Sequence, residues 1–64
     1  MKRLVFYEDP NADPLVETGS VICGDPAGMI ETATGPKCAD ALVVGDRYRW
    51  PDGACVRIDA IEES

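Results

Sequence analysis

Six carboxylates lie between Leu4 and Pro36, and no lysine or arginine interrupts them. These acids are Glu8, Asp9, Asp13, Glu17, Asp25 and Glu31. A segment charged with one sign attracts a cationic partner and repels nucleic acid and anionic membranes. We therefore take the six acids as candidate contact residues for a basic protein, with a purely solubilising role as the alternative.

Oxygen-ligand chemistry offers a second interpretation of the same segment. Four residues match the first, third, fifth and ninth positions of a calcium-binding loop: Asp9, Asn11, Asp13 and Glu17. However, Pro14 stands where such a loop needs glycine, and Ser20 stands where it needs a bidentate glutamate. A solvated acidic loop is therefore expected in place of a metal site.

The chain offers little for catalysis. It has no histidine, so the commonest general base is absent. It also lacks a glycine-rich phosphate loop, a nucleophile elbow and a zinc-binding helix motif. We expect a protein that is not an enzyme and that uses no cofactor.

The cysteines Cys23, Cys38 and Cys55 are odd in number and widely spaced, so they do not form a disulfide framework. Without a Cys-x-x-Cys pair or histidine they do not make a zinc site. No basic segment followed by an apolar stretch opens the chain, so free thiols in a reducing cytoplasm are expected. A Cys23–Cys38 cross-link is the alternative.

Size and charge narrow the class of partner. A chain of 64 residues makes one small domain, residues 1–64, with a small core. No apolar run approaches the roughly 18 residues of a membrane span. A net charge of −6 disfavours direct binding to nucleic acid.

The N-terminal half predicts two strands joined by a loop. Arg3–Tyr7 is rich in β-branched and aromatic residues and indicates a first strand. Prolines at both ends make Pro10–Pro14 a loop. Leu15–Cys23 is a weaker second strand in which Gly19-Ser20 predicts a bulge or turn.

A short helix is predicted after the second strand. Asp25 is a good N-cap, Pro26 suits the first helical position, and Gly35-Pro36 suits the helix end. Asp25 is therefore the weakest of the six contact candidates, because capping alone accounts for it. The alternative for Met29–Thr34 is a strand, and Lys37–Leu42 fits a second short helix or a turn.

The C-terminal third predicts a β-hairpin from Arg47 to Ile61 around the loop Pro51-Asp52-Gly53. A positive φ at Gly53 sets Trp50 opposite Ala54. The apolar face of the hairpin then consists of Tyr48, Trp50, Ala54, Val56, Ile58 and Ala60. The polar face consists of Arg47, Arg49, Cys55, Arg57 and Asp59.

This register places Arg47 across from Arg57, a like-charge pair that is unfavourable unless carboxylates lie nearby. The hairpin arginines are expected to pair with acids of the N-terminal half or to stay solvated. Tyr48 and Trp50 alternate on the apolar face, which favours a core position over base stacking.

The segment from Leu42 to Ile61, with Gly45-Asp46 before one strand and Asp52-Gly53 after it, resembles a hairpin of small SH3-like barrels. The resemblance implies a small curved antiparallel sheet and no particular function. We therefore predict an α+β domain, in which a small antiparallel sheet is combined with one short helix.

In its size, its acidity and its lack of catalytic groups the whole chain resembles the small acidic anti-CRISPR proteins that phages encode against bacterial host defence. The resemblance implies an inhibitor whose acidic surface mimics DNA and occupies a cationic nucleic-acid-binding site of an effector complex. A different class of function is also open: a small β-sheet module for protein interaction or virion assembly.

Overall fold

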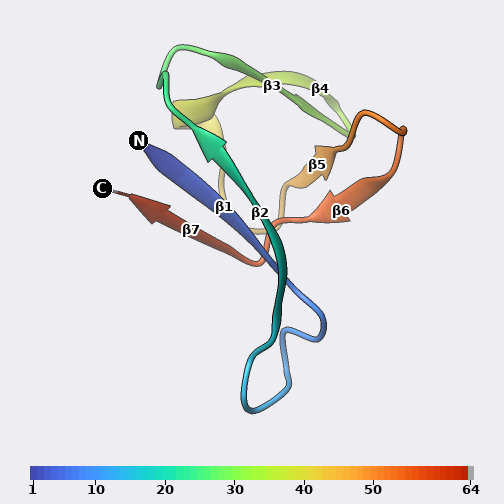
Figure 1. Ribbon diagram of the computed structural model, residues 1–64. Helices are drawn as coiled ribbons and strands as arrows, with labels where there is room; N and C mark the ends of the chain where they lie inside the picture. The colour runs from blue at the N-terminus through green and yellow to red at the C-terminus, as the bar shows by residue number, and fades with distance from the viewer. Residues whose placement is uncertain (64) are drawn as a thin grey trace.

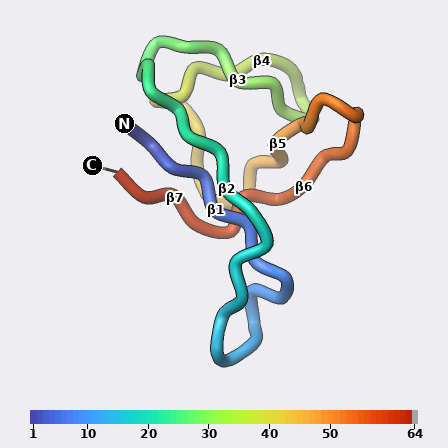
Figure 2. The backbone as a smooth tube through the Cα atoms, viewed as in Figure 1, coloured from blue at the N-terminus to red at the C-terminus, as the bar shows by residue number. Residues whose placement is uncertain are grey.

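Strand β1 (Lys2–Tyr7) lies at the centre of a three-stranded antiparallel sheet in a computed structural model that describes residues 1–63 (Figure 1). Its neighbours are β2 (Glu17–Cys23) and β7 (Ala60–Glu63), so the order is β2-β1-β7. The strand predicted at Arg3–Tyr7 is confirmed. β7 places Glu63 opposite Lys2, which brings the two ends of the described chain together (Figure 2).

A second antiparallel sheet has the order β4-β3-β5-β6. Its strands are β3 (Met29–Thr32), β4 (Gly35–Cys38), β5 (Arg47–Arg49) and β6 (Cys55–Arg57). A single turn of 3-10 helix, η1 (Ala39–Ala41), follows β4. None of the helical turns in residues 1–63 is long enough to cross a membrane.

The core lies between the two sheets. Its buried residues are Leu4, Phe6, Cys23, Ala39, Leu42 and Ile58. The Phe6 ring lies 6.0 Å from Tyr48 and 5.4 Å from Trp50, and those two rings meet edge-on at 5.0 Å. Aromatic pairs of this kind add about 0.5–1.5 kcal/mol beyond burial alone. This cluster therefore joins the hairpin to β1. Tyr48 and Trp50 lie on the predicted apolar face, but they are half-buried against the core rather than part of it.

The predicted α+β class is wrong, because no α-helix forms anywhere in the described chain. Asp25 does not cap a helix; its carboxylate accepts the N–H of Ala27 at 2.9 Å in a tight turn. Asp-Pro suits such a turn as well as a helix start, and Gly28 and β-branched Thr32 weaken the helix. The strand alternative is confirmed over Met29–Thr32.

The neighbouring predictions were partly right. The second strand starts at Glu17, two residues later than Leu15. Its irregularity lies at Thr18, because Phe6 pairs with Gly19 whereas Tyr7 pairs with Glu17. The helical turn expected within Lys37–Leu42 occupies only Ala39–Ala41.

The hairpin register is confirmed, but the predicted second strand is too long. Arg47 pairs with Arg57 and Tyr48 with Val56, and Gly53 has φ 93°. The strand ends at Arg57 because Asp59 turns toward β1, where its N–H donates to the Val5 carbonyl at 3.0 Å. The apolar face is only partly covered, since Val56 remains 39% exposed.

Candidate partner-binding surfaces

The connection between β1 and β2 projects from the body as a long loop, which we call the acidic arm (residues 8–16; Figures 1 and 2). A bond from the Glu8 N–H to the Val16 carbonyl, 2.8 Å long, closes its base. The arm carries three of the six predicted acids: Glu8, Asp9 and Asp13. All three are exposed.

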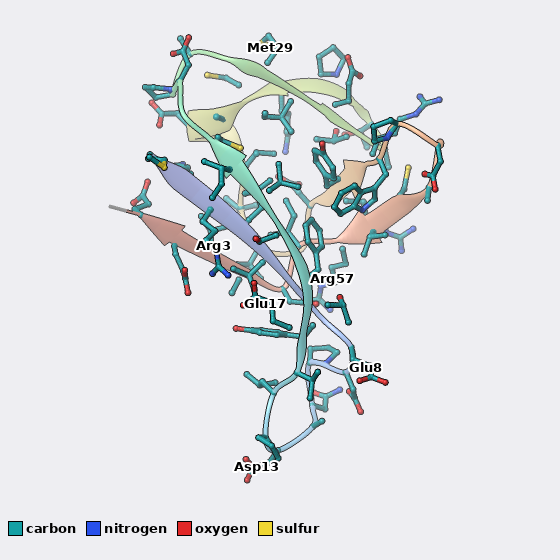
Figure 3. The ribbon with its side chains drawn as sticks, viewed as in Figure 1. Arg3, Glu8, Asp13, Glu17, Met29 and Arg57 are labelled. Carbon is teal, nitrogen blue, oxygen red and sulfur yellow. The ribbon has the colours of Figure 1, made fainter. Side chains whose placement is uncertain are left out.

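Within the arm the three acids differ in their bonding. The Asp9 carboxylate accepts the N–H of Asn11 at 2.9 Å, so it also shapes the turn. The carboxylates of Glu8 and Asp13 have no hydrogen bond or ion pair in the described structure, and both side chains point outward (Figure 3). The arm therefore presents unpaired negative charge on a projecting loop.

Glu17 lies at the base of the arm, but it is committed to an ion pair. The guanidinium of Arg3 on β1 binds Glu17 on β2 and, at 2.7 Å, Glu62 on β7. The hydrogen bonds that the Arg3 guanidinium donates, first to Glu17 and then to Glu62, raise the pKa of Arg3 above its ordinary value. Arg3 thus links all three strands of this sheet. Because the Glu17 charge is paired with Arg3, it is less available to a partner than the sequence analysis assumed.

The remaining two candidates lie elsewhere. Asp25 is held in the turn after β2, and Glu31 is on β3 in the second sheet. Met29 of the same strand is at the opposite end of the molecule from Asp13 (Figure 3). The six acids therefore do not form one surface; the fold gathers only those of the arm and places Glu31 apart from them.

The lysines are also paired. Lys2 Nζ donates to the Ala39 carbonyl at 3.1 Å and lies 3.6 Å from the Glu63 carboxylate. Lys37 binds both oxygens of Asp46 at 3.1 Å. The backbone N–H of Val43, followed by Lys37, lowers the pKa of Asp46 below its ordinary value. The contacts of Asp46 with Lys37 and Val43 hold the loop between η1 and β5.

The second surface is the polar face of the β5–β6 hairpin, which we call the arginine face (Arg47, Arg49, Arg57 and Cys55). All four side chains are exposed. None of the three arginines has an ion pair or side-chain hydrogen bond within residues 1–63, although the chain has 12 acids. Of the two expectations for these arginines, pairing with N-terminal acids is not found among the described residues, and the solvated alternative is confirmed.

A shallow groove opens where β3 and β5 diverge. The two strands pair only at Thr32 and Tyr48. The groove is lined by Met29, Ile30, Glu31, Tyr48, Arg49, Trp50 and Pro51. Glu31 and Arg49 both border it without pairing with each other in the described chain. No side chain that lines the groove is a nucleophile with a general base beside it.

Metal and thiol chemistry adds little to these surfaces. Within residues 1–63, no three side chains of the metal-binding types cluster closely enough to hold an ion. Cys23, Cys38 and Cys55 are all free, as expected, so the alternative Cys23–Cys38 cross-link does not form. Burial raises the pKa of the Cys23 thiol, an effect that nearby Lys2 partly offsets.

The chain was compared with protein-family models, with curated proteins and with solved structures, and none of them matches it.

Proposed function

We propose that the protein is a non-catalytic inhibitor whose acidic arm occupies a cationic nucleic-acid-binding site of a CRISPR-type bacterial defence complex in the host cytoplasm. The observation that supports this proposal is the unpaired charge of Glu8 and Asp13 on a projecting loop. A projecting acidic loop can enter a groove that receives nucleic acid. Arginines that line such a groove pair with carboxylates as they do with phosphates.

The proposal limits direct contact to the arm and to the strand that supports it. Glu8, Asp9 and Asp13 form the leading edge of the arm, and Glu17 supports it from β2. Asp25 and Glu31 contribute through the net charge of −6 rather than through contact. Association is therefore expected to be fast at low salt and to slow steeply as salt rises.

The test compares two double variants of equal net charge. Glu8→Lys with Asp13→Lys reverses the arm, whereas Glu31→Lys with Asp40→Lys reverses two exposed acids outside it. Each changes the net charge from −6 to −2, since every reversal adds two charges. Binding to a guide-loaded CRISPR effector complex is measured by surface plasmon resonance at 50 and 300 mM salt, with target DNA as competitor.

The arm variant is expected to lose association rate by on the order of tenfold or more, and the control variant by clearly less. Saturating target DNA should prevent binding of the unmodified protein. Equal losses in the two variants would show that only net charge matters, and binding that persists beside bound DNA would exclude the proposed site.

A second candidate function, a small β-sheet interaction or assembly module, is favoured by a different observation. Val43 and Val44 are adjacent and are 59% and 51% exposed, and Ile22 is 57% exposed. An apolar contact is not weakened by salt. A partner whose binding holds or strengthens at 300 mM salt would therefore favour this alternative over the acidic arm.

A further inference from the structure

The hydrogen-bond pattern of the β5–β6 hairpin determines how the residues of the arginine face are paired. Trp50 N donates to the Ala54 carbonyl and Ile58 N to the Asp46 carbonyl, each at 2.8 Å. Hydrogen-bonded and non-hydrogen-bonded pairs alternate along an antiparallel ladder. Arg47–Arg57 and Arg49–Cys55 are therefore the non-hydrogen-bonded pairs of this hairpin.

Two consequences follow from this alternation. Residues of a non-hydrogen-bonded pair lie closer together, with Cα atoms about 4.5 Å apart, so Arg47 and Arg57 start from the closest cross-strand position. Their like charges then repel, and neither guanidinium forms an ion pair with a carboxylate of the described chain. An anion between them would relieve this repulsion.

The second consequence concerns the backbone of β6. This strand is the last in the order β4-β3-β5-β6, and its three residues are exposed. Because Cys55 and Arg57 do not bond to β5, their N–H and C=O groups point to the open edge of the sheet. An added strand forms hydrogen bonds with backbone groups that are two residues apart, as those of Cys55 and Arg57 are.

We propose that this edge binds an extended acidic segment of another protein, which adds to β6 as a fifth strand of the sheet. Side chains at alternate positions of that segment fall on the arginine face, so the motif is a pair of carboxylates separated by one residue. One carboxylate lies beside Arg57 and within reach of Arg47. Peptide N–H and C=O groups bond to Cys55 and Arg57.

The chemistry of the face favours a peptide over a nucleic acid. Single-stranded nucleic acid needs aromatic side chains on which bases stack. Tyr48 and Trp50 pack on Phe6 on the opposite face of the hairpin, where they border the groove rather than the arginine face. The net charge of −6 also repels a long polyanion more than a short segment with two or three acids.

The proposed site is independent of the acidic arm, and its test uses two capped peptides of equal composition. In one, glutamate alternates with threonine; in the other, glutamates come in adjacent pairs, so each face carries only half of them. Binding is followed by NMR titration of the full chain at low salt. The alternating peptide should shift and protect the amides of Cys55 and Arg57, and it should bind several-fold more tightly than the paired peptide.

Two variants separate the contribution of the arginine charges from that of the backbone groups at the sheet edge. The double variant Arg47→Gln with Arg57→Gln should weaken the binding of the alternating peptide on the order of three- to tenfold, because exposed ion pairs contribute only modestly to affinity. Cys55→Pro removes one edge N–H but keeps every arginine, and Cys55→Ala is its matched control. A peptide N-methylated on the side that faces β6 makes the same test without changing the protein.

Several results would overturn the proposal. Equal binding of the two peptides, or full binding of the N-methylated peptide, would reduce the face to a non-specific anion site. Tighter binding of single-stranded DNA than of the alternating peptide would assign the face to nucleic acid. No binding of either peptide would mean that the arginines only protect the edge from pairing with other chains. Reversal of Glu8 and Asp13 should leave peptide binding intact.

Discussion

Replacing Arg57 with glutamate should stabilise the domain, because the like-charge pair with Arg47 becomes an ion pair. In water two unit charges 5 Å apart interact by about 0.8 kcal/mol. Changing repulsion into attraction therefore gives up to about 1.6 kcal/mol at low salt. Solvation and side-chain entropy at this exposed site reduce the expected gain to about 0.5–1 kcal/mol.

The matched control is Arg49→Glu. Both variants change the net charge from −6 to −8, since each removes one positive and adds one negative charge. Arg49 lies opposite Cys55 and only diagonal to Arg57, so the control gains the weaker diagonal contact. The difference between the variants measures the direct pair.

Thermal unfolding followed by circular dichroism at 20 and 500 mM salt provides the assay. A gain of about 1 kcal/mol raises the Tm of a domain this small by roughly 4–8 °C. We expect the Arg57→Glu variant to have a higher Tm than the Arg49→Glu variant at 20 mM salt, with the gap shrinking at 500 mM. If the two variants have the same Tm at low salt, the close cross-strand repulsion deduced from the register does not exist.

Three further predictions concern the turn, the acids and the thiols. Gly53→Ala should lower the free energy of unfolding by about 1–2 kcal/mol in urea, because Gly53 has φ 93°; Gly24→Ala is the control, because a methyl group at either glycine has open space. Asp46 stabilises the fold above its ordinary pKa of 3.8, and this contribution is lost as pH falls through its lower folded value, so Asp46→Asn should flatten the acid decline in Tm. Iodoacetamide should label exposed Cys55 well before buried Cys23, as read by peptide mass spectrometry.

Each of these has a contrary result. Equal losses of unfolding free energy in Gly53→Ala and Gly24→Ala would mean that the turn tolerates alanine. An unchanged slope of Tm against pH below 3.8 in Asp46→Asn would remove Asp46 from the acid response. Labelling of Cys23 as fast as Cys55 in the folded protein would mean that the core opens readily.

The sequence predicted the parts of the fold that depend on local chemistry. Pro51-Asp52-Gly53 set the hairpin register because a tight loop leaves few ways to align two alternating runs. The run Arg3–Tyr7 has no helical period, so its strand was clear. The helix after Asp25 was wrong because the same aspartate-proline pair starts a helix or a turn, and tertiary contacts decide between them.

Features that depend on distant pairing could not be predicted in this way. Nothing near Ala60 indicates that β7 leaves the hairpin and joins β1. The separation of Glu31 from the arm, and the capture of Glu17 by Arg3, also follow from how the two sheets are assembled. The sequence identified the six acids as one set of candidates, and only the fold shows which of them lie on the arm and which lie elsewhere.

The pairing of β7 with β1 also has a kinetic consequence. Lys2 lies opposite Glu63, so the first and last strands must find each other across nearly the whole chain. Closing so long a loop costs chain entropy before the contact gives anything in return. The domain should therefore refold in milliseconds to seconds rather than microseconds. On the ribosome, β1 should keep an unpaired edge until β7 has been made.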